Sequence, residues 1–405
     1  MNRGNMAAEL TCILPDASFL IQPDQSYPPL INFESHYQSA GVFYAMRDLL
    51  LQQDPSFAST ISELTATQQL TLLLRHKQQV AESLDADDIT GLVRRLKAMP
   101  IEHREIFRLL HDMGAVPGFP VLVGPFTVRT QQDLKSHIAS RYPHCTPRRI
   151  DDLARYAPPD TAVVSIALET RDADRAQERA DMWFSRFGYL MAYITGSQGT
   201  TRGAAVLNVP STVPETSLVL SGTDARSATR MTTGLPSIGM FYLTDPVRGF
   251  DRIWDIVTRW GEDSATKGKG DLLERRILNA VEWVGRGMRD PDPIRAFVQY
   301  MIGLEGLFTS RDKDTPVTHR LIEFSAFVGG TDKNRRREIA REAKNLYAKR
   351  SDIAHGTEAT VTPEDLYRAW KFVSQQITSL LVDEELRGMT DYRQLQDWVE
   401  DRKYR

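Results

Sequence analysis

The chain has 405 residues and a formal net charge of −3 at pH 7, from 50 basic and 53 acidic side chains. This length is too great for one ordinary hydrophobic core, so we expect two or three domains. The near-neutral charge excludes a protein that binds nucleic acid over its whole surface, and any RNA-binding surface must be a local patch.

Cysteine content and apolar runs bear on the cellular compartment. The two cysteines, Cys12 and Cys145, exclude a disulfide scaffold and favour a reducing compartment. Pro15 and Asp16 interrupt the short apolar stretch near the start, which makes it a poor signal peptide. No apolar run approaches the length that spans a bilayer. We therefore expect a cytoplasmic protein that does not associate with membranes.

Residues 1–116 are expected to form a mainly helical region. Four segments within residues 36–114 show apolar residues three and four positions apart, the pattern of an amphipathic helix. The last of these segments, residues 102–114, follows Pro100 and ends at Gly114. It is interpreted here as the fourth helix.

Residues 117–262 have a different character and are expected to form a small mixed α/β domain, a candidate sensor or regulatory unit. Short strands are predicted at 119–128, 163–169, 204–209 and 217–221, and a helix at 172–193. The apolar face of this helix consists of Ala176, Ala180, Trp183, Phe187 and Leu190. Another helix, 248–260, precedes the polar, Gly- and Lys-rich segment 262–270, which is the predicted domain boundary.

Residues 268–385 carry only helical signals and predict an antiparallel bundle. Asp271 and Glu274 resemble a capping box at the first helix, Gly356 suits the end of the fourth, and Thr362 caps the fifth. Residues 386–405 are expected to add a terminal amphipathic helix. The predicted fold class is thus multidomain α+β, with a mainly helical N-terminal region, a mixed middle domain and a C-terminal helical bundle.

The fourth helix of this bundle, residues 334–355, has an unusual apolar stripe. Arg350 occupies the position where the stripe should continue, and a desolvated guanidinium needs an anion. The anion is either an acid inside the bundle or the phosphate of a ligand. Glu305 also points toward the bundle, either to contact Arg350 or Tyr347 or to form an unrelated structural pair. The stripe itself consists of Ile339, Ala343, Leu346 and Ile353.

His355 lies in the last turn of the same helix, where Ser351 or Asp352 could orient its imidazole. The alternative is a histidine that only satisfies terminal carbonyls. An arginine that binds phosphate and a histidine that moves a proton suffice for metal-free RNA cleavage by the 2′-hydroxyl. Residues five apart lie about 140° apart on a helix, so a second subunit would help to bring Arg350 and His355 to one phosphate.

Basic residues crowd the same helix and suggest a track for an RNA backbone, although such runs are often only solvated faces. The predicted RNA-binding residues are Lys333, Arg335, Arg336, Arg337, Arg341, Lys344 and Lys349.

The sequence R-S-D-I-A-H-G at 350–356, preceded by N-L-Y-A-K, is similar to the R-x(4–6)-H signature of the HEPN superfamily, in its Apea-like branch. The upstream G-L-E-G-L-F at 303–308 resembles an L-E-x-L-F segment of that branch. The resemblance covers the last third of the chain. Many active members have Asn, His or Asp directly after the arginine, where this chain has Ser351.

The resemblance implies a metal-independent endoribonuclease that acts as a homodimer without cofactors. It further implies that Arg350 binds the scissile phosphate, that His355 acts as acid or base, and that the protein is an anti-phage defence effector or a toxin. We expect residues 1–262 to sense an unidentified trigger or to restrain the nuclease. The alternative is a non-catalytic module that binds nucleotide or RNA, or that only dimerises.

Overall fold

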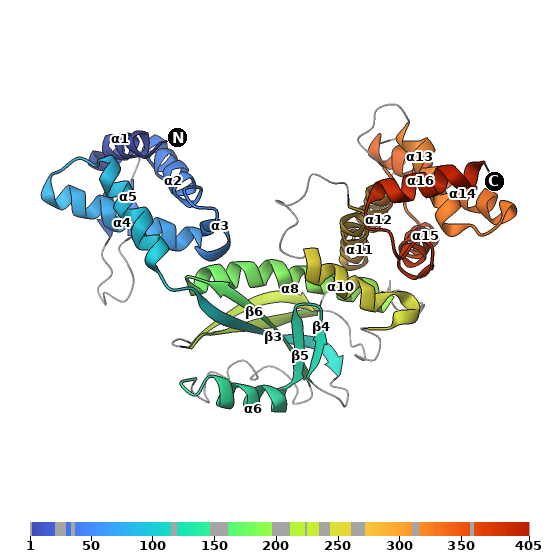
Figure 1. The fold of residues 1–405 in the computed structure, drawn as a ribbon, viewed down its shortest axis with the longest axis horizontal. Coiled ribbons are helices and arrows are strands. Elements are labelled where there is room, and N and C mark those ends of the chain that lie inside the picture. Colours follow the sequence, from blue (N-terminus) through green and yellow to red (C-terminus); the bar gives the residue numbers. More distant parts are fainter. Residues whose placement is uncertain are drawn as a thin grey trace.

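The computed structural model shows a mainly helical protein with antiparallel sheets (Figure 1). The structure describes residues 2–20, 30–33, 37–114, 120–145, 161–196, 211–222, 225–234, 244–260, 272–309, 316–356 and 360–404. In this part of the chain, no helix is both long and apolar enough to cross a membrane.

The N-terminal helices form a unit with a hydrophobic core of its own, to which Phe43, Leu70 and Leu92 contribute fully buried side chains. Figure 1 shows this unit at the opposite end of the molecule from the C-terminal helices. A two-stranded antiparallel sheet, β1 (Ser18–Leu20) and β2 (Leu30–Asn32), accompanies it. The helices are α1 (Arg3–Ile13), η1 (Leu14–Asp16), α2 (Tyr37–Leu51), α3 (Phe57–Thr60), α4 (Glu63–Val80) and α5 (Ala86–Ala98).

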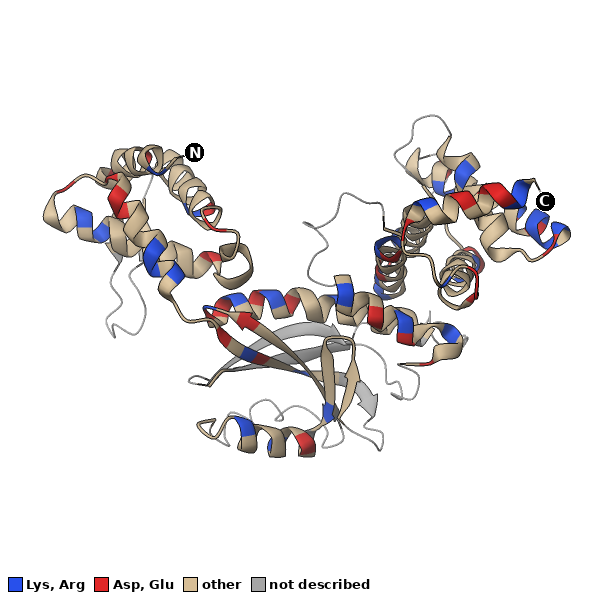
Figure 2. Ribbon diagram, in the orientation of Figure 1, with Lys and Arg blue, Asp and Glu red and all other residues tan. Residues whose placement is uncertain are grey.

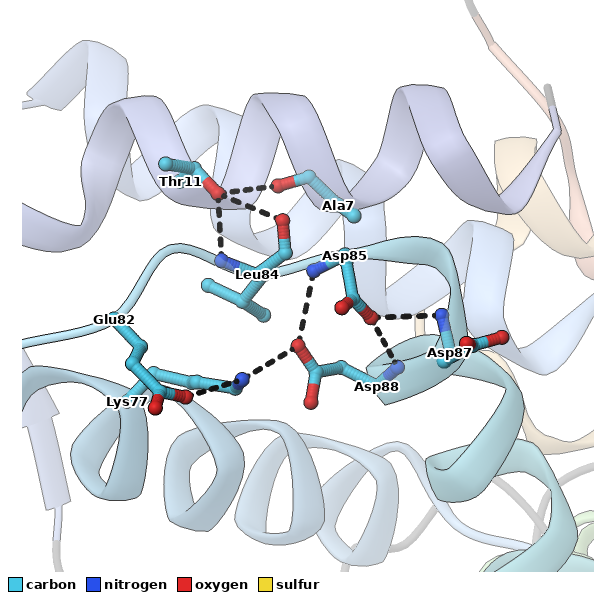
Figure 3. A network of polar contacts seen from close by, with 8 residues as sticks. All are labelled: Ala7, Thr11, Lys77, Glu82, Leu84, Asp85, Asp87 and Asp88. Carbon is cyan, nitrogen blue, oxygen red and sulfur yellow. Dashed lines mark hydrogen bonds and ion pairs between the residues drawn. The ribbon is translucent and has the colours of Figure 1, made fainter. Parts of the chain in front are cut away.

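Polar contacts fix the connection between α4 and α5 (Figure 3). The ammonium of Lys77 lies 2.9 Å from Asp88 and 3.1 Å from Glu82, and the hydrogen bonds that it donates to these carboxylates raise the pKa of Lys77. Asp85 and Asp88 form a capping box that satisfies free N–H groups at the start of α5. The loop is thereby tied to both helices.

A six-stranded antiparallel sheet, in the order β4-β5-β6-β3-β7-β8, follows the N-terminal unit along the chain. Figure 1 shows α8 (Ala173–Gly196) along one side of the sheet and α6 (Gln131–Arg141) on the other. The strands are β3 (Glu102–Gly114), β4 (Val121–Val123), β5 (Phe126–Thr130), β6 (Thr161–Thr170), β7 (Ser211–Leu220) and β8 (Ala225–Gly234). The five predicted apolar residues of the helix in 172–193 are all buried.

The prediction of a helix at residues 102–114 is wrong, because this segment is the strand β3 between β6 and β7. Both of its faces are covered, so residues from Arg104 to Leu109 are all buried and the alternation typical of a strand is lost. Its apolar residues then stand at 106, 107, 109 and 110, which imitates helical spacing. The strand predicted at 204–209 lies outside the described residues.

The C-terminal helices agree with the predicted ones in order and extent. Their predicted apolar faces are buried, as Leu273, Ile277 and Val284 illustrate for α11. Asp271, the expected capping-box residue, lies outside the described residues; the N-cap of α11 is Leu272, and no side-chain hydrogen bond is made at that cap. The elements are η3 (Pro246–Arg248), α10 (Phe250–Trp260), α11 (Leu273–Arg289), α12 (Pro293–Phe308), α13 (Val317–Gly329), α14 (Lys333–Ala354), α15 (Pro363–Val382) and α16 (Tyr392–Lys403).

The hydrophobic core continues from the sheet into the C-terminal helices without interruption. An ideal Cβ on Gly285 of α11 would lie 2.0 Å from the carbonyl oxygen of Tyr189 in α8, so only glycine permits this approach. Glu274 is buried at the start of α11 and accepts hydrogen bonds from Arg259 (2.6 Å) and Trp260 (2.7 Å) of α10. Helices α8 and α10 therefore pack against the bundle as well as against the sheet.

The N-terminal unit is joined to the sheet mainly by hydrogen bonds to backbone groups. Arg179 of α8 donates to the carbonyl of Ser59 at 2.8 Å, and Asp172 accepts from the amide of Ser62 at 3.0 Å. The amide of Arg171 donates to the carbonyl of Thr60 at 2.8 Å. This junction is polar, whereas α8 and α11 share the continuous hydrophobic core and are also joined by the ion pair between Arg186 and Glu282.

Candidate functional site

Helix α14 carries most of the residues that the sequence singled out. Asp332 caps its start by accepting from the amides of Asn334 (2.8 Å) and Arg335 (3.0 Å). At the other end His355 is the C-cap, and Gly356 follows with a φ of +72°, the left-handed conformation expected for a glycine there. Helix α14 packs against α12 and α13 through Ile339, Ala343 and Leu346, which are buried as predicted.

Arg350 faces inward and forms an ion pair with Glu305 of α12. The Nε of Arg350 lies 2.9 Å from Oε1 of Glu305, and Nη2 donates to Oε2 at 3.4 Å. The side chains are 29% and 21% exposed. The contact expected between these residues is thus present, and it supplies the anion that the half-buried guanidinium needs.

The geometry of this pair is loose. The 3.4 Å contact is long for a hydrogen bond, and the buried atoms Nε and Oε1 face each other without an aligned N–H···O bond. Burial raises the pKa of Glu305, and the charge of Arg350 only partly opposes that rise. A guanidinium has five N–H donors, so Arg350 can contact a second anion while it keeps Glu305.

His355 faces solvent, unlike Arg350. Its amide donates to the carbonyl of Ser351 at 2.9 Å, which places Ser351 one turn earlier on the same side of α14. Ser351 is half-buried, and His355 and Asp352 are exposed. Tyr347, expected near Glu305, is half-buried against the hydrophobic core. The imidazole is therefore available to an external ligand.

Four of the seven predicted RNA-binding residues form one exposed stripe, which we call the basic stripe: Lys333, Arg337, Arg341 and Lys344. At about 100° per residue these positions fall within an arc of about 80°, and Ser351 and His355 fall within the same arc. The stripe therefore leads along α14 to the histidine.

The other three predicted RNA-binding residues lie elsewhere on α14. Arg335 pairs with Glu338 at 3.0 Å on another side of the helix. Arg336 donates to the carbonyl of Gly330 at 3.1 Å and lies over the ring of Phe327. Figure 2 shows that basic residues of the C-terminal bundle are spread over several helices rather than confined to α14.

Lys349 is tied to the start of α15. Its ammonium lies 2.7 Å from Asp365, which also caps this helix together with Thr362. Burial raises the pKa of Asp365, but hydrogen bonds from Lys349 and Thr362 outweigh burial and lower this pKa to about 2. Lys349 thus has a structural partner of opposite charge.

A polar network that was not predicted from the sequence lies on the side of the sheet that faces α6. Glu105 of β3 is buried, and its Oε1 accepts from Ser165 (2.8 Å) and Arg129 (3.2 Å). Its Oε2 lies 2.7 Å from Nε2 of His137 and accepts from the Tyr142 hydroxyl at 3.2 Å. The carboxylate lies between serine and histidine, so the histidine is not placed to activate the serine as a general base.

Two pKa shifts follow from this network. Burial raises the pKa of Glu105, but the hydrogen bond and charge of His137, with Arg129 and Ser165, outweigh it and hold the pKa below its usual value. Burial and the Glu105 charge raise the pKa of the Tyr142 hydroxyl to about 12. The network therefore holds an ionised carboxylate under α6 at neutral pH. The network was not predicted because segment 102–114 was interpreted as a helix. Interpreted as a strand, the segment places Glu105 and Phe107 on the same face.

Comparison with known proteins found no matching family model, no matching curated protein and no matching solved structure.

Proposed function

We propose that the C-terminal bundle is a HEPN-type, metal-independent endoribonuclease that cleaves RNA by transesterification. The observation that carries this proposal is the placement of His355. It is an exposed histidine at the end of the basic stripe, with Ser351 on the same side of the helix. A backbone that follows Lys333, Arg337, Arg341 and Lys344 would bring a phosphate to the imidazole.

The reaction requires one attack and one departure at phosphorus. The 2′-oxygen loses its proton to a base and bonds to the adjacent phosphorus, and the 5′-oxygen leaves with a proton from an acid. The products are a 2′,3′-cyclic phosphate and a 5′-hydroxyl. His355 serves as base or acid, and Arg350 stabilises the charge on the phosphate oxygens.

We further propose a homodimer whose site combines residues of both subunits. This follows from the different directions of Arg350 and His355 on α14, because one chain presents only the histidine to a strand on the basic stripe. The arginine of the second copy would complete the site. The bundle, about 268–385, would then be the nuclease domain.

The first 262 residues would respond to a trigger or restrain the nuclease, in a defence or toxin system. Support comes from the continuous core, because α8 contacts both the sheet and α11. A change in the sheet could therefore reach the bundle. If full-length protein and protein lacking residues 1–100 cleave RNA at equal rates without any trigger, restraint by the N-terminal helices is ruled out.

The decisive experiment is cleavage of mixed cellular RNA in EDTA by wild type, Arg350→Ala, His355→Ala and the control His319→Ala. His319 is an exposed histidine on α13 of the same bundle. We expect cleavage with 2′,3′-cyclic phosphate ends by wild type and His319→Ala only, with all four proteins folded by circular dichroism. Equal cleavage by all four, or none by wild type with and without residues 1–100, contradicts the proposal.

The second candidate function is a non-catalytic module, and the ion pair between Arg350 and Glu305 favours it. That contact explains the inward position of Arg350 by a structural ion pair, without any substrate. Expression in cells separates the two functions. A nuclease freed of its control is toxic as wild type and tolerated as His355→Ala, whereas a scaffold behaves alike in both forms.

A further inference from the structure

An arginine of α11 lies between two aromatic rings where α11 meets α8, on the side of α8 away from the sheet (Figure 1). The guanidinium carbon of Arg286 is 4.8 Å from the ring centre of Trp283 on α11 and 4.9 Å from that of Tyr189 on α8. The guanidinium of Arg289 lies over the same Tyr189 ring at 5.8 Å. The two rings together hold the guanidinium of Arg286 in one place.

Arg286 differs from other arginines of this protein that lie over aromatic rings. The following also do so, and each of them forms a hydrogen bond or an ion pair in addition: Arg47, Arg108, Arg186, Arg276, Arg336 and Arg402. Arg286 forms neither with any residue that the structure describes. Its Nε is buried, whereas its two Nη groups remain accessible to solvent.

The surface around Arg286 has the composition of a protein interface. Met182, Arg186 and Tyr189 are spaced by four and three residues, so they lie on one side of α8. Met182 is 62% exposed, and Tyr189 and Trp283 are half-buried. Methionine, aromatic residues and arginine are enriched in protein interfaces, and Trp, Tyr and Arg supply most of the binding energy there.

The free N–H groups of Arg286 determine the chemistry of the partner. A guanidinium fits a carboxylate through two parallel hydrogen bonds, and the stacked rings have already fixed its position. An RNA backbone would need a row of cations, but the neighbouring Arg186 is neutralised by Glu282 at 2.5 Å. The free guanidinium and the apolar surface beside it therefore fit a protein segment that carries a carboxylate next to an apolar side chain.

We propose that a partner protein binds here through an Asp or Glu that is adjacent to a large apolar residue. The surface consists of Met182, Tyr189, Trp283 and Arg286. The carboxylate pairs with the Nη groups of Arg286, and the apolar side chain packs on Met182 and Tyr189. Because α8 covers the sheet and α11 begins the bundle, the partner contacts both parts at once. The proposal does not depend on the nuclease, since it uses neither of the two residues proposed for catalysis.

The test begins with random peptides of about twelve residues, displayed on phage and selected on the full-length protein. We expect the enriched sequences to carry Asp or Glu next to Leu, Ile, Met, Phe or Trp. One enriched peptide is synthesised, and its affinity is measured by fluorescence anisotropy. Replacement of its acid by Asn or Gln should weaken binding by about tenfold or more. Failure to enrich such sequences overturns the proposal.

Variants locate the site. Arg286→Gln should weaken binding of this peptide by about tenfold or more. Met182→Glu changes an exposed position and should weaken binding similarly, because the new charge repels the carboxylate of the peptide. Arg402→Gln is the matched control: Arg402 also lies over a ring, that of Trp398, but it already pairs with Glu385, so the affinity should not change. Unchanged affinity in Arg286→Gln and Met182→Glu, with both folded by circular dichroism, overturns the proposal.

Two other occupants give different results. An uncleavable 2′-O-methyl oligouridine that displaces the peptide and binds Arg286→Gln more weakly than wild type would identify a nucleic-acid surface. Self-association of wild type that is lost in Arg286→Gln, measured by sedimentation velocity, would identify a second copy of the chain as the occupant. Either result overturns the proposal, and we expect neither.

Discussion

Arg350 and His355 are five residues apart on α14, and their side chains leave the helix on different sides, one toward Glu305 and one toward solvent. If the catalytic site combines Arg350 of one subunit with His355 of the other, two inactive variants can complement each other. In an equal mixture of Arg350→Ala and His355→Ala chains, half of the dimers are mixed and each has one intact site. We expect about a quarter of wild-type cleavage after co-refolding. No recovery, with mixed dimers present by mass, would show that each site uses one chain.

The ion pair between Glu305 and Arg350 should contribute measurably to stability. Glu305→Gln leaves a half-buried guanidinium without its charge partner, and we expect a loss of about 1–2 kcal/mol, less than for a fully buried pair. A double-mutant cycle with Arg350→Gln, followed by urea unfolding, measures the coupling. The more exposed pair of Glu342 and Arg368 serves as the control and should couple more weakly. Equal coupling energies in the two pairs would show that the ion pair of Arg350 stabilises the fold no more than a more exposed pair does.

The basic stripe should determine how RNA affinity depends on salt. Each of the changes Lys333→Gln, Arg337→Gln, Arg341→Gln and Lys344→Gln should lower the slope of log affinity against log salt by about 0.7 for single-stranded RNA. Arg335→Gln should leave the slope unchanged, because this residue lies on another side of α14. Fluorescence anisotropy at several salt concentrations is the measurement, and a slope that falls equally with Arg335→Gln contradicts the stripe.

The Glu105 network should make stability depend on pH. The folded-state pKa of Glu105 is lowered, so its stabilisation is complete above the ordinary value of 4.5 and is lost as pH falls through the lowered pKa. Glu105→Gln should therefore cost about 2–3 kcal/mol at pH 7 and progressively less below pH 4.5. Glu169→Gln, on an exposed position of β6, is the control. Thermal melts from pH 3 to 7 should converge for Glu105→Gln and wild type; a constant gap would assign the effect to packing alone.

The contact between α8 and α11 requires a residue without a side chain at position 285. Gly285→Ala would place Cβ 2.0 Å from the Tyr189 oxygen, and we expect overpacking to cost about 1–3 kcal/mol. Gly306→Ala on α12 meets nothing within 4 Å and should stabilise by about 0.5–1 kcal/mol. Urea unfolding of both variants measures the difference. An equal gain in both would mean that α8 and α11 are further apart than the structure places them.

The sequence predicted the C-terminal helices well because each has one apolar face and one exposed face. It also predicted that Arg350 turns inward, since the guanidinium interrupts a stripe of known period. Strand β3 could not be recognised in the same way, because a strand covered on both faces loses its period. The network around Glu105 depends on which strands are neighbours and on where α6 crosses them. That information resides in the pairing of distant segments, not in local spacing.

The indole of Trp370 illustrates the same limit. Trp370 was correctly placed on the apolar face of its helix, but the spacing does not reveal that its indole N–H finds no hydrogen-bond acceptor among the residues that the structure describes. Whether this N–H finds an acceptor depends on the elements that pack against α15, and these are distant from it in the sequence.

Helix α8 packs against both the sheet and the C-terminal bundle within one continuous core, so the parts of the protein differ in how freely they could diversify. The N-terminal helices possess a core of their own and touch the rest mainly through hydrogen bonds, so another unit could replace them by exchange near residue 100. The sheet cannot be exchanged in this way, because its covering helix is also a wall of the bundle. Sheet and bundle should therefore melt in one calorimetric transition and be inherited together, whereas the N-terminal helices can change independently.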